Sequence, residues 1–187
     1  MGSKLKIKNT KFEGLYVLQP IIHEDDRGSF SRVFCEEELA EFLDGENIKQ
    51  INHSITDKKG TVRGMHFQYA PNTEVKIVRC IKGKVFDVVV DIRKGSKTFL
   101  EQFSIELSAE NKTMLYIPKG FAHGFQTLEN NTELFYLHTN IYTPNNEGAL
   151  NIKDPLLHIS FPLDIINLSE KDNEHEFIKK DFRGIDV

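Results

Sequence analysis

Residues 75–92 read VKIVRCIKGKVFDVVVDI, and this run carries the clearest structural pattern in the 187-residue chain. In its second half, two sets of side chains alternate: Phe86, Val88, Val90 and Ile92 with Val85, Asp87, Val89 and Asp91. A period of two places successive side chains on opposite faces of an extended chain. The pattern therefore predicts a β-strand over residues 84–92.

The first half of the same run predicts a second strand, over residues 75–81, because it is rich in β-branched side chains. Lys82 and Gly83 lie between the two strands and predict a hairpin turn. Further β-rich segments are punctuated by glycine and proline: residues 15–22, 30–34, 103–107, 114–117, 123–128 and 133–142. Many short strands of this kind favour an antiparallel sandwich or barrel.

Helical signals are few. Residues 36–43 predict one helix with Gly45 as a late cap, and Ser169 is placed to cap a turn that begins at Glu170. The chain has no internal repeat, low-complexity tract or linker that would divide it. We therefore predict one mostly β domain over residues 1–187, with short peripheral helices.

Three charged residues interrupt these apolar strands. Lys76, Asp87 and Asp91 lie among side chains apolar enough to be buried. A buried charge is costly unless it is paired or used in chemistry. Two interpretations stay open: the three charges belong to a site, or they lie on a solvent-facing side of the sheet.

Composition excludes several functional classes. The net charge is −4 with both signs spread along the chain, so no basic surface for nucleic acid is predicted. Cys35 and Cys80 are too few for a disulfide framework and are predicted to be buried free thiols in a reducing compartment. The sequence shows no secretory leader at its start and no run of about 20 apolar residues. We expect a cytoplasmic protein without membrane segments.

Two segments concentrate reactive side chains among turn-forming residues: RGMHFQ at 63–68 and PKGFAHGF at 118–125. Each places a histidine, His66 or His123, shortly after a glycine-containing bend. Histidine suits proton transfer near neutral pH, so the pair indicates acid/base chemistry. The alternative is that each histidine is a hydrogen-bonded structural residue.

A further alternative to acid/base chemistry is a metal site. Small β-barrels of the cupin type bind iron, manganese or zinc through histidines and a carboxylate, and His66, Glu74 and His123 are candidates. Such sites normally begin with two histidines separated by one residue, but the second position here is Gln68, an amide and a poor ligand. We therefore predict no metal.

The motifs together resemble the dTDP-4-dehydrorhamnose 3,5-epimerases, over residues 12–172. Each motif is weak alone, but the ordered set is specific: DRG at 26–28, QINHS at 50–54, RGMHFQ at 63–68, KIVR at 76–79, DVVVDIR at 87–93, PKGFAHGF at 118–125, YTP at 142–144, DP at 154–155 and LSEKD at 168–172.

The resemblance implies a cupin-type antiparallel β-barrel, or jelly roll, that acts as an isomerase of deoxysugar biosynthesis. It implies a nucleoside-diphosphate 4-keto-6-deoxy sugar whose C3, C5 or both are inverted by metal-free proton transfer, without a cofactor. By likeness, His66 is the base and Asp172 the carboxylate that orients it. Lys76 is the enolate stabiliser and Tyr136 the acid on the opposite face.

The resemblance also implies substrate-binding residues. Asp87 and His123 match active-site positions and could steady Lys76 and His66 or bind sugar hydroxyls. The other implied contacts are Arg63 and Tyr142 for the diphosphate, Gln50 and Asn52 for sugar or phosphate, and Arg27 and Phe30 for the base. In the family a neighbouring subunit completes this last edge, which implies a homodimer.

Some positions depart from the family pattern: Arg32 replaces an acidic residue near the base, Leu137 replaces a lysine and is followed by His138, and Ile152 replaces a tryptophan before Lys153. Recognition of thymine is therefore open. The alternatives are a single-carbon epimerase acting on another nucleoside-diphosphate 4-keto sugar, a metal-dependent isomerase or oxygenase, and a catalytically silent sugar-nucleotide binding module.

Overall fold

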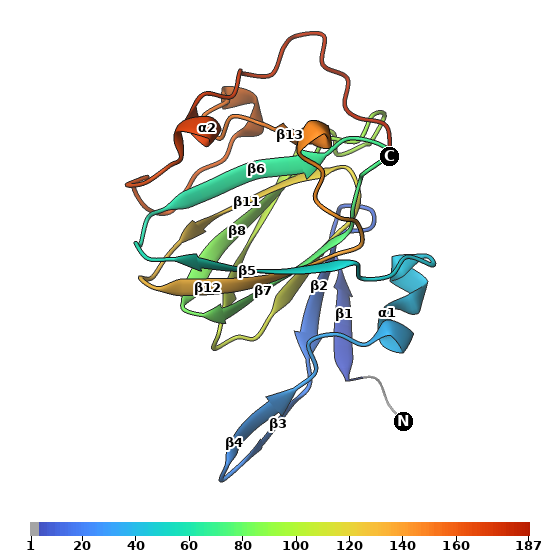
Figure 1. Cartoon of the computed structure of the whole chain (residues 1–187), viewed down its shortest axis with the longest axis vertical. Coiled ribbons are helices and arrows are strands. Elements are labelled where there is room, and N and C mark those ends of the chain that lie inside the picture. Colours follow the sequence, from blue (N-terminus) through green and yellow to red (C-terminus); the bar gives the residue numbers. More distant parts are fainter. Residues whose placement is uncertain (1–3) are drawn as a thin grey trace.

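The computed structural model describes residues 4–187, and in this part of the chain two antiparallel sheets pack face to face (Figure 1). The six-stranded sheet contains, in spatial order, β1 (Leu5–Asn9), β2 (Tyr16–Pro20), β10 (Met114–Ile117), β7 (Lys76–Lys82), β12 (Thr132–His138) and β5 (Gln50–Thr56). The five-stranded sheet contains β13 (Glu147–Ala149), β6 (Val62–Gln68), β11 (Phe121–Thr127), β8 (Lys84–Asp91) and β9 (Gln102–Ser108). The predicted antiparallel β architecture is confirmed.

The remaining elements are short and peripheral. Strands β3 (Ile22–Asp25) and β4 (Gly28–Ser31) form a separate hairpin that projects from the body in Figure 1. Helix α1 has the predicted bounds, Glu36–Leu43, and α2 spans Glu170–Asn173, with the Ser169 hydroxyl accepting the amide N–H of Asp172 as predicted. Two 3₁₀ turns, η1 (Pro144–Asn146) and η2 (Pro155–Leu157), complete the described elements.

The predicted hairpin between residues 75–81 and 84–92 is wrong. Strand β7 pairs with β10 and β12, whereas β8 pairs with β11 and β9, so the chain crosses from one sheet to the other at Gly83. Gly83 has a φ of +72°, and a Cβ atom there would lie 2.6 Å from the Thr132 hydroxyl. Periodicity identified both strands but carried no information about their partners.

Both faces of β8 are buried, which explains its unbroken apolar character. Val85 and Val89 pack between the two sheets. Val88 and Val90 pack on the outer face, which is covered by residues from the C-terminal part of the chain, among them Leu150, Ile152, Leu157 and Ile185. The orange-to-red segment in Figure 1 follows this covering layer over β6 and β11.

This burial decides between the two interpretations of the embedded charges. Asp87 and Asp91 have no exposed surface and Lys76 is 9% exposed. The interpretation that these charges lie on a solvent-facing side of the sheet is therefore wrong. Asp91 serves structure: it forms an ion pair with Arg93 and accepts hydrogen bonds from Ser96 and Thr98. Asp87 and Lys76 belong to the site described below.

The two histidine segments lie in strands rather than in bends. They form much of β6 and β11, which are paired so that His66 lies opposite His123. The backbones approach closely beside the histidines, because a Cβ atom on Gly64 would lie 2.5 Å from the Cα atom of Gly124. The sequence predicts none of β1, β5, β6 and β13 and only the first residue of β3, because polar residues and glycines mask the alternation of these strands.

No helix in the described part of the chain is long and apolar enough to cross a membrane. Both cysteines are free thiols. Cys80 is buried as predicted, and burial raises its pKa to about 11. Cys35 is only partly buried, because it lies at the exposed beginning of α1.

Candidate active site

A cavity of about 550 Å³ opens between the two sheets, with both sheets and the C-terminal segment contributing to its wall. Its size is in the usual range for a small-molecule site. Side chains of the six-stranded sheet reach it from β5, β7 and β12, and those of the five-stranded sheet reach it from β6 and β11. Ten of the twelve predicted site residues fall at this cavity or directly behind it: His66, Tyr136, Asp172, Lys76, Gln50, Asn52, Arg63, His123 and Tyr142 line it, and Asp87 lies behind His123.

His66 and Asp172 form the predicted pair. His66 Nε2 lies 2.8 Å from Asp172 Oδ1, although 106 residues separate the two in sequence. Burial raises the pKa of Asp172, but the hydrogen bond and charge of His66 outweigh this and hold that pKa below its usual value. The carboxylate is therefore ionised at neutral pH and orients the ring so that Nδ1 is the nitrogen left for proton transfer.

Tyr136 lies on the opposite sheet, where its hydroxyl is 3.3 Å from the hydroxyl of Ser54. Burial raises the pKa of Tyr136 above its ordinary value, so the phenol keeps its proton at neutral pH. Ser54 was not predicted. It follows Asn52 by two positions on β5, and that spacing on a strand points both side chains the same way.

His123 and Asp87 form a second imidazole–carboxylate pair. His123 Nε2 lies 2.9 and 3.0 Å from the two carboxylate oxygens of Asp87. Asp87 is completely buried, and burial raises its pKa despite the neighbouring imidazole. Asp87 is not among the residues that line the cavity, and its carboxylate contacts the imidazole of His123.

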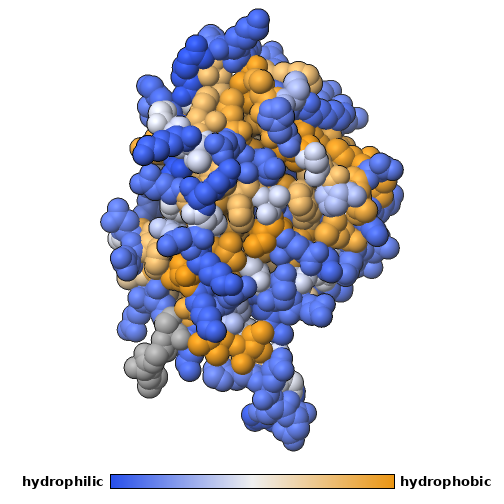
Figure 2. All heavy atoms as spheres, turned by 180° about the vertical axis from the view of Figure 1, so that it is seen from behind, coloured by the Kyte–Doolittle hydropathy of each residue, from blue (hydrophilic) through white to orange (hydrophobic). Residues whose placement is uncertain are grey.

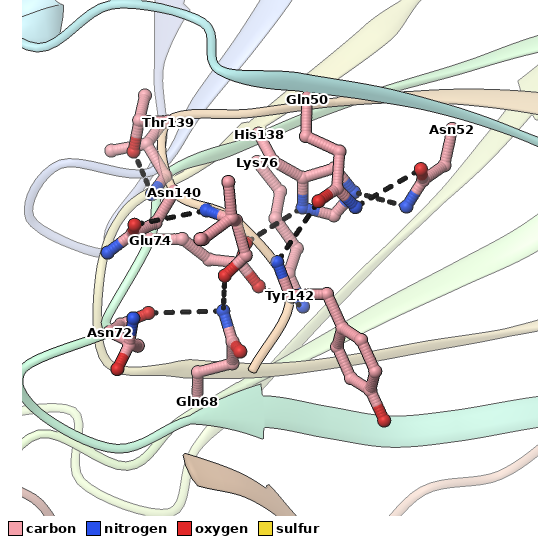
Figure 3. A network of polar contacts seen from close by, with 12 residues as sticks. Gln50, Asn52, Gln68, Asn72, Glu74, Lys76, His138, Thr139, Asn140 and Tyr142 are labelled. Atoms are coloured by element: carbon pink, nitrogen blue, oxygen red, sulfur yellow. Dashed lines mark hydrogen bonds and ion pairs between the residues drawn. The ribbon is translucent and has the colours of Figure 1, made fainter. Parts of the chain in front are cut away.

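Lys76 is held by the carboxylate of Glu74, which the sequence suggests only as a candidate metal ligand. Its Nζ atom lies 3.3 Å from Glu74 Oε1 and 3.4 Å from the carbonyl oxygen of His66. His138 Nδ1 lies 2.8 Å from the other oxygen, Glu74 Oε2 (Figure 3). The expectation that Asp87 could steady Lys76 is therefore replaced by Glu74. The sequence signal for Glu74 and His138 is their spacing: each lies two residues from a predicted site residue, Lys76 or Tyr136, and so points to the same side of an extended chain.

The three candidate metal ligands, His66, Glu74 and His123, do not form one cluster. In the structure His66 is bound to Asp172, Glu74 to His138, and His123 to Asp87. Gln68 connects two loops: its side chain donates to the carbonyl of Asn72 (Figure 3). It also accepts the amide N–H of Thr143. Within residues 4–187, the one cluster of potential metal-binding groups is a different set, His66, Asp172 and His175.

Polar groups also line the part of the cavity near Gln50 and Tyr142. Gln50 Oε1 accepts the amide N–H of Tyr142 at 3.0 Å, and Gln50 Nε2 donates to Asn52 Oδ1 at 3.1 Å. Arg63 is exposed, and its Nε donates to the Thr56 hydroxyl at 3.2 Å. This bond does not use the two terminal nitrogens of the guanidinium. Lys171, paired with Glu147, is a further cation of the wall that the sequence had not singled out although it lies in LSEKD.

Arg27 and Phe30 do not reach the cavity of their own chain. Both lie on or beside the projecting β3–β4 hairpin, where Phe30 is 75% exposed and Arg27 pairs with Asp25. Arg32, the reversed charge of the sequence pattern, pairs with Glu38 of α1. These residues are therefore placed apart from the nine that line the cavity.

Comparisons with known proteins agree with this geometry. The family model described as dTDP-4-dehydrorhamnose 3,5-epimerase matches residues 9–180. The chain is 42% identical over 166 residues to the dTDP-4-dehydrorhamnose 3,5-epimerase of Salmonella typhimurium, covering 87% of this chain and 90% of the relative.

Solved structures give the same result. One is the dTDP-6-deoxy-D-glucose-3,5-epimerase of Legionella pneumophila in complex with dTDP-4-keto-L-rhamnose, with a TM-score of 0.85, 40% identity and coverage of 90% of this chain and 89% of that one. Another is a 3'-monoepimerase of Streptomyces bikiniensis in complex with dTDP-quinovose, with a TM-score of 0.83, 32% identity and coverage of 90% and 85%. The predicted cupin-type fold is confirmed. The chain belongs to the dTDP-4-dehydrorhamnose 3,5-epimerase family.

Proposed function

We propose that this chain inverts C3, C5 or both in a nucleoside-diphosphate 4-keto-6-deoxy sugar by metal-free proton transfer. The observation that carries the proposal is the convergence of an aspartate-held imidazole, a protonated phenol and an ammonium on one cavity. These are the base, the acid and the enolate stabiliser that inversion next to a ketone requires.

The proposed reaction begins when His66 Nδ1 removes the proton from a carbon beside the ketone. The electron pair of that C–H bond moves toward the carbonyl oxygen, and Lys76 stabilises the resulting enolate. Tyr136 then donates its hydroxyl proton to the same carbon from the other face, which inverts the centre. Imidazolium and tyrosinate return to their starting states by exchanging protons with water.

The nucleotide part of the substrate is proposed to occupy the part of the cavity lined by Arg63 and Tyr142. Arg63 suits the diphosphate because a guanidinium binds phosphate oxygens through several donors at once. Tyr142, Gln50 and Asn52 border the same region and offer further contacts. Two related structures hold thymidine diphosphate sugars, which makes this nucleotide the first to test.

We also propose a homodimer in which the β3–β4 hairpin of one copy reaches the cavity of the other. Support comes from the projection of the hairpin away from its own body and from the exposure of Phe30 and Ile22. Figure 2 shows hydrophilic atoms at the tip of the projection and hydrophobic atoms beside its base. Light scattering should give twice the monomer mass. A monomer with full activity would contradict this arrangement.

A cytoplasmic location completes the proposal. Its support is the presence of two free cysteines, Cys35 and Cys80, which suits a reducing compartment.

Uptake of deuterium from heavy water into a panel of 4-keto sugar nucleotides tests the proposed reaction. Label at C3 and C5 indicates a double epimerase, and label at one carbon indicates the single-carbon alternative. This alternative is supported by the likeness to a 3'-monoepimerase. No label with any member of the panel would sink the proposal, and binding without exchange would favour a silent binding module. Elemental analysis tests the metal-dependent alternative: a stoichiometric metal lost together with activity would support it.

A further inference from the structure

The cavity wall contains a third imidazole–carboxylate pair that the proposed reaction does not use. His66 is paired with Asp172 and His123 with Asp87, while His138 is paired with Glu74 at 2.8 Å. His138 and Glu74 both line the cavity, and their side chains are only 11% and 7% exposed. A pair so thoroughly removed from water at a reaction site invites a functional explanation.

A series of polar contacts runs through this pair from Tyr142 at one end to Lys76 at the other (Figure 3). The amide N–H of Tyr142 donates to Gln50 at 3.0 Å, and Gln50 donates to Asn52 at 3.1 Å. Asn52 Nδ2 approaches His138 Nε2 at 3.5 Å, and His138 Nδ1 lies 2.8 Å from Glu74 Oε2.

The polarity of this chain assigns the proton on His138. A carboxylate only accepts hydrogen bonds, so Nδ1 must carry the hydrogen that is shared with Glu74. Nε2 faces the amide nitrogen of Asn52 at 3.5 Å, so it is placed to accept a hydrogen bond from that amide. In this arrangement His138 acts as a donor to Glu74 through Nδ1.

Glu74 transmits this fixation to Lys76. Its two oxygens have different partners, His138 at Oε2 and the Lys76 ammonium at Oε1, 3.3 Å away. Burial raises the pKa of Glu74, but the hydrogen bond from His138 and the charge of Lys76 outweigh this and lower it overall. The carboxylate is therefore charged, and without His138 its Oε2 would be buried and unpaired, which favours rotation of the carboxylate and displacement of the ammonium.

We propose that His138 is a positioning residue that acts through Glu74 to hold the Lys76 ammonium where the enolate oxygen forms. The inference rests on the proposed function. It assigns a role to His138, the residue directly after the position where Leu137 replaces a lysine.

Substitutions at position 138 provide the test, with deuterium uptake as the measurement. His138→Phe removes the donor to Glu74 and should lower kcat about 10- to 100-fold while KM changes less than about twofold. His138→Asn places an amide N–H close to the position of Nδ1 and should restore most of kcat. In a Glu74→Gln background, the further substitution His138→Phe should change kcat by less than about twofold, because the group through which it acts is already altered.

The outer face of the same sheet supplies a matched control. His53 lies 3.0 Å from Glu133 Oε2, and the other oxygen of Glu133 lies 3.0 Å from Lys82, so the same three residue types are joined in the same way away from the cavity. His53→Phe should leave kcat unchanged.

Several outcomes would overturn the inference: an unchanged kcat in His138→Phe, an equal loss in His138→Asn, or an undiminished effect of His138→Phe in the Glu74→Gln background. A loss of kcat in His53→Phe as large as in His138→Phe would overturn it too. These results presuppose exchange by the native protein. No exchange by the native protein with any substrate would instead refute the proposed function, and this inference with it.

Discussion

Replacing Asp172 with asparagine tests the base of the proposed reaction through its partner. The carboxylate lies 2.8 Å from His66 Nε2, and its side chain is only 6% exposed, so water cannot take its place. The amide keeps the volume but removes the charge that stabilises imidazolium. A hydrogen bond to a charged group contributes about 1.5–3 kcal/mol. We therefore expect kcat to fall about 10- to 150-fold, at a factor of ten for each 1.36 kcal/mol.

The assay is the initial rate of deuterium uptake per folded molecule, with the folded fraction measured by circular dichroism. Asp154→Asn is the matched control, because Asp154 and Asp172 are each 4% exposed and each carboxylate accepts a backbone N–H, from Leu156 and Gly64 respectively. Asp154 is outside the cavity wall, so its replacement should lower the melting temperature without lowering kcat. A change of less than twofold in Asp172→Asn, or an equal loss in Asp154→Asn, would refute the reasoning.

Three further outcomes are expected. Gly64→Ala should lower the free energy of unfolding by about 2 kcal/mol or more, as measured by urea unfolding. The reason is that Gly64 has a φ of +134° and a new Cβ atom would lie 2.5 Å from Gly124 Cα. Unchanged stability would contradict this close approach. Asp91→Asn should cost about 3 kcal/mol at pH 7 by breaking the buried pair with Arg93. Burial raises the pKa of Asp91, but its hydrogen bonds lower that pKa overall. This contribution should therefore be fully present above pH 4, and it should decline as pH falls below 3.8 toward the lowered pKa of the folded state. An equal cost at pH 7 and pH 2 would contradict this. Because burial raises the pKa of Tyr136 above 10.0, the phenol should stay protonated, and the rate of inversion should not fall through loss of this proton below pH 10. A fall in rate with a midpoint near pH 8 that disappears in Tyr136→Phe would contradict this role.

Local patterns predicted much of this molecule. Helix α1 has the predicted bounds, and β8 and β10 lie within or match the predicted strands, because their alternation reports which side chains are buried. The motif resemblance predicted nine residues that line the cavity and the pairing of His66 with Asp172 across 106 positions. These features were accessible because they depend on residue type and order along the chain.

Other features depend on contacts between distant segments. The periodicity of residues 75–92 is compatible with a hairpin and with two strands in different sheets, and the long-range pairings with β11 and β12 select the second arrangement. The same pairing places Asp87 behind His123 and joins Glu74 to both Lys76 and His138. The sequence of a strand indicates that its faces are buried, but it does not indicate which distant segments cover them. The partners of the buried charges are therefore decided only by the tertiary structure.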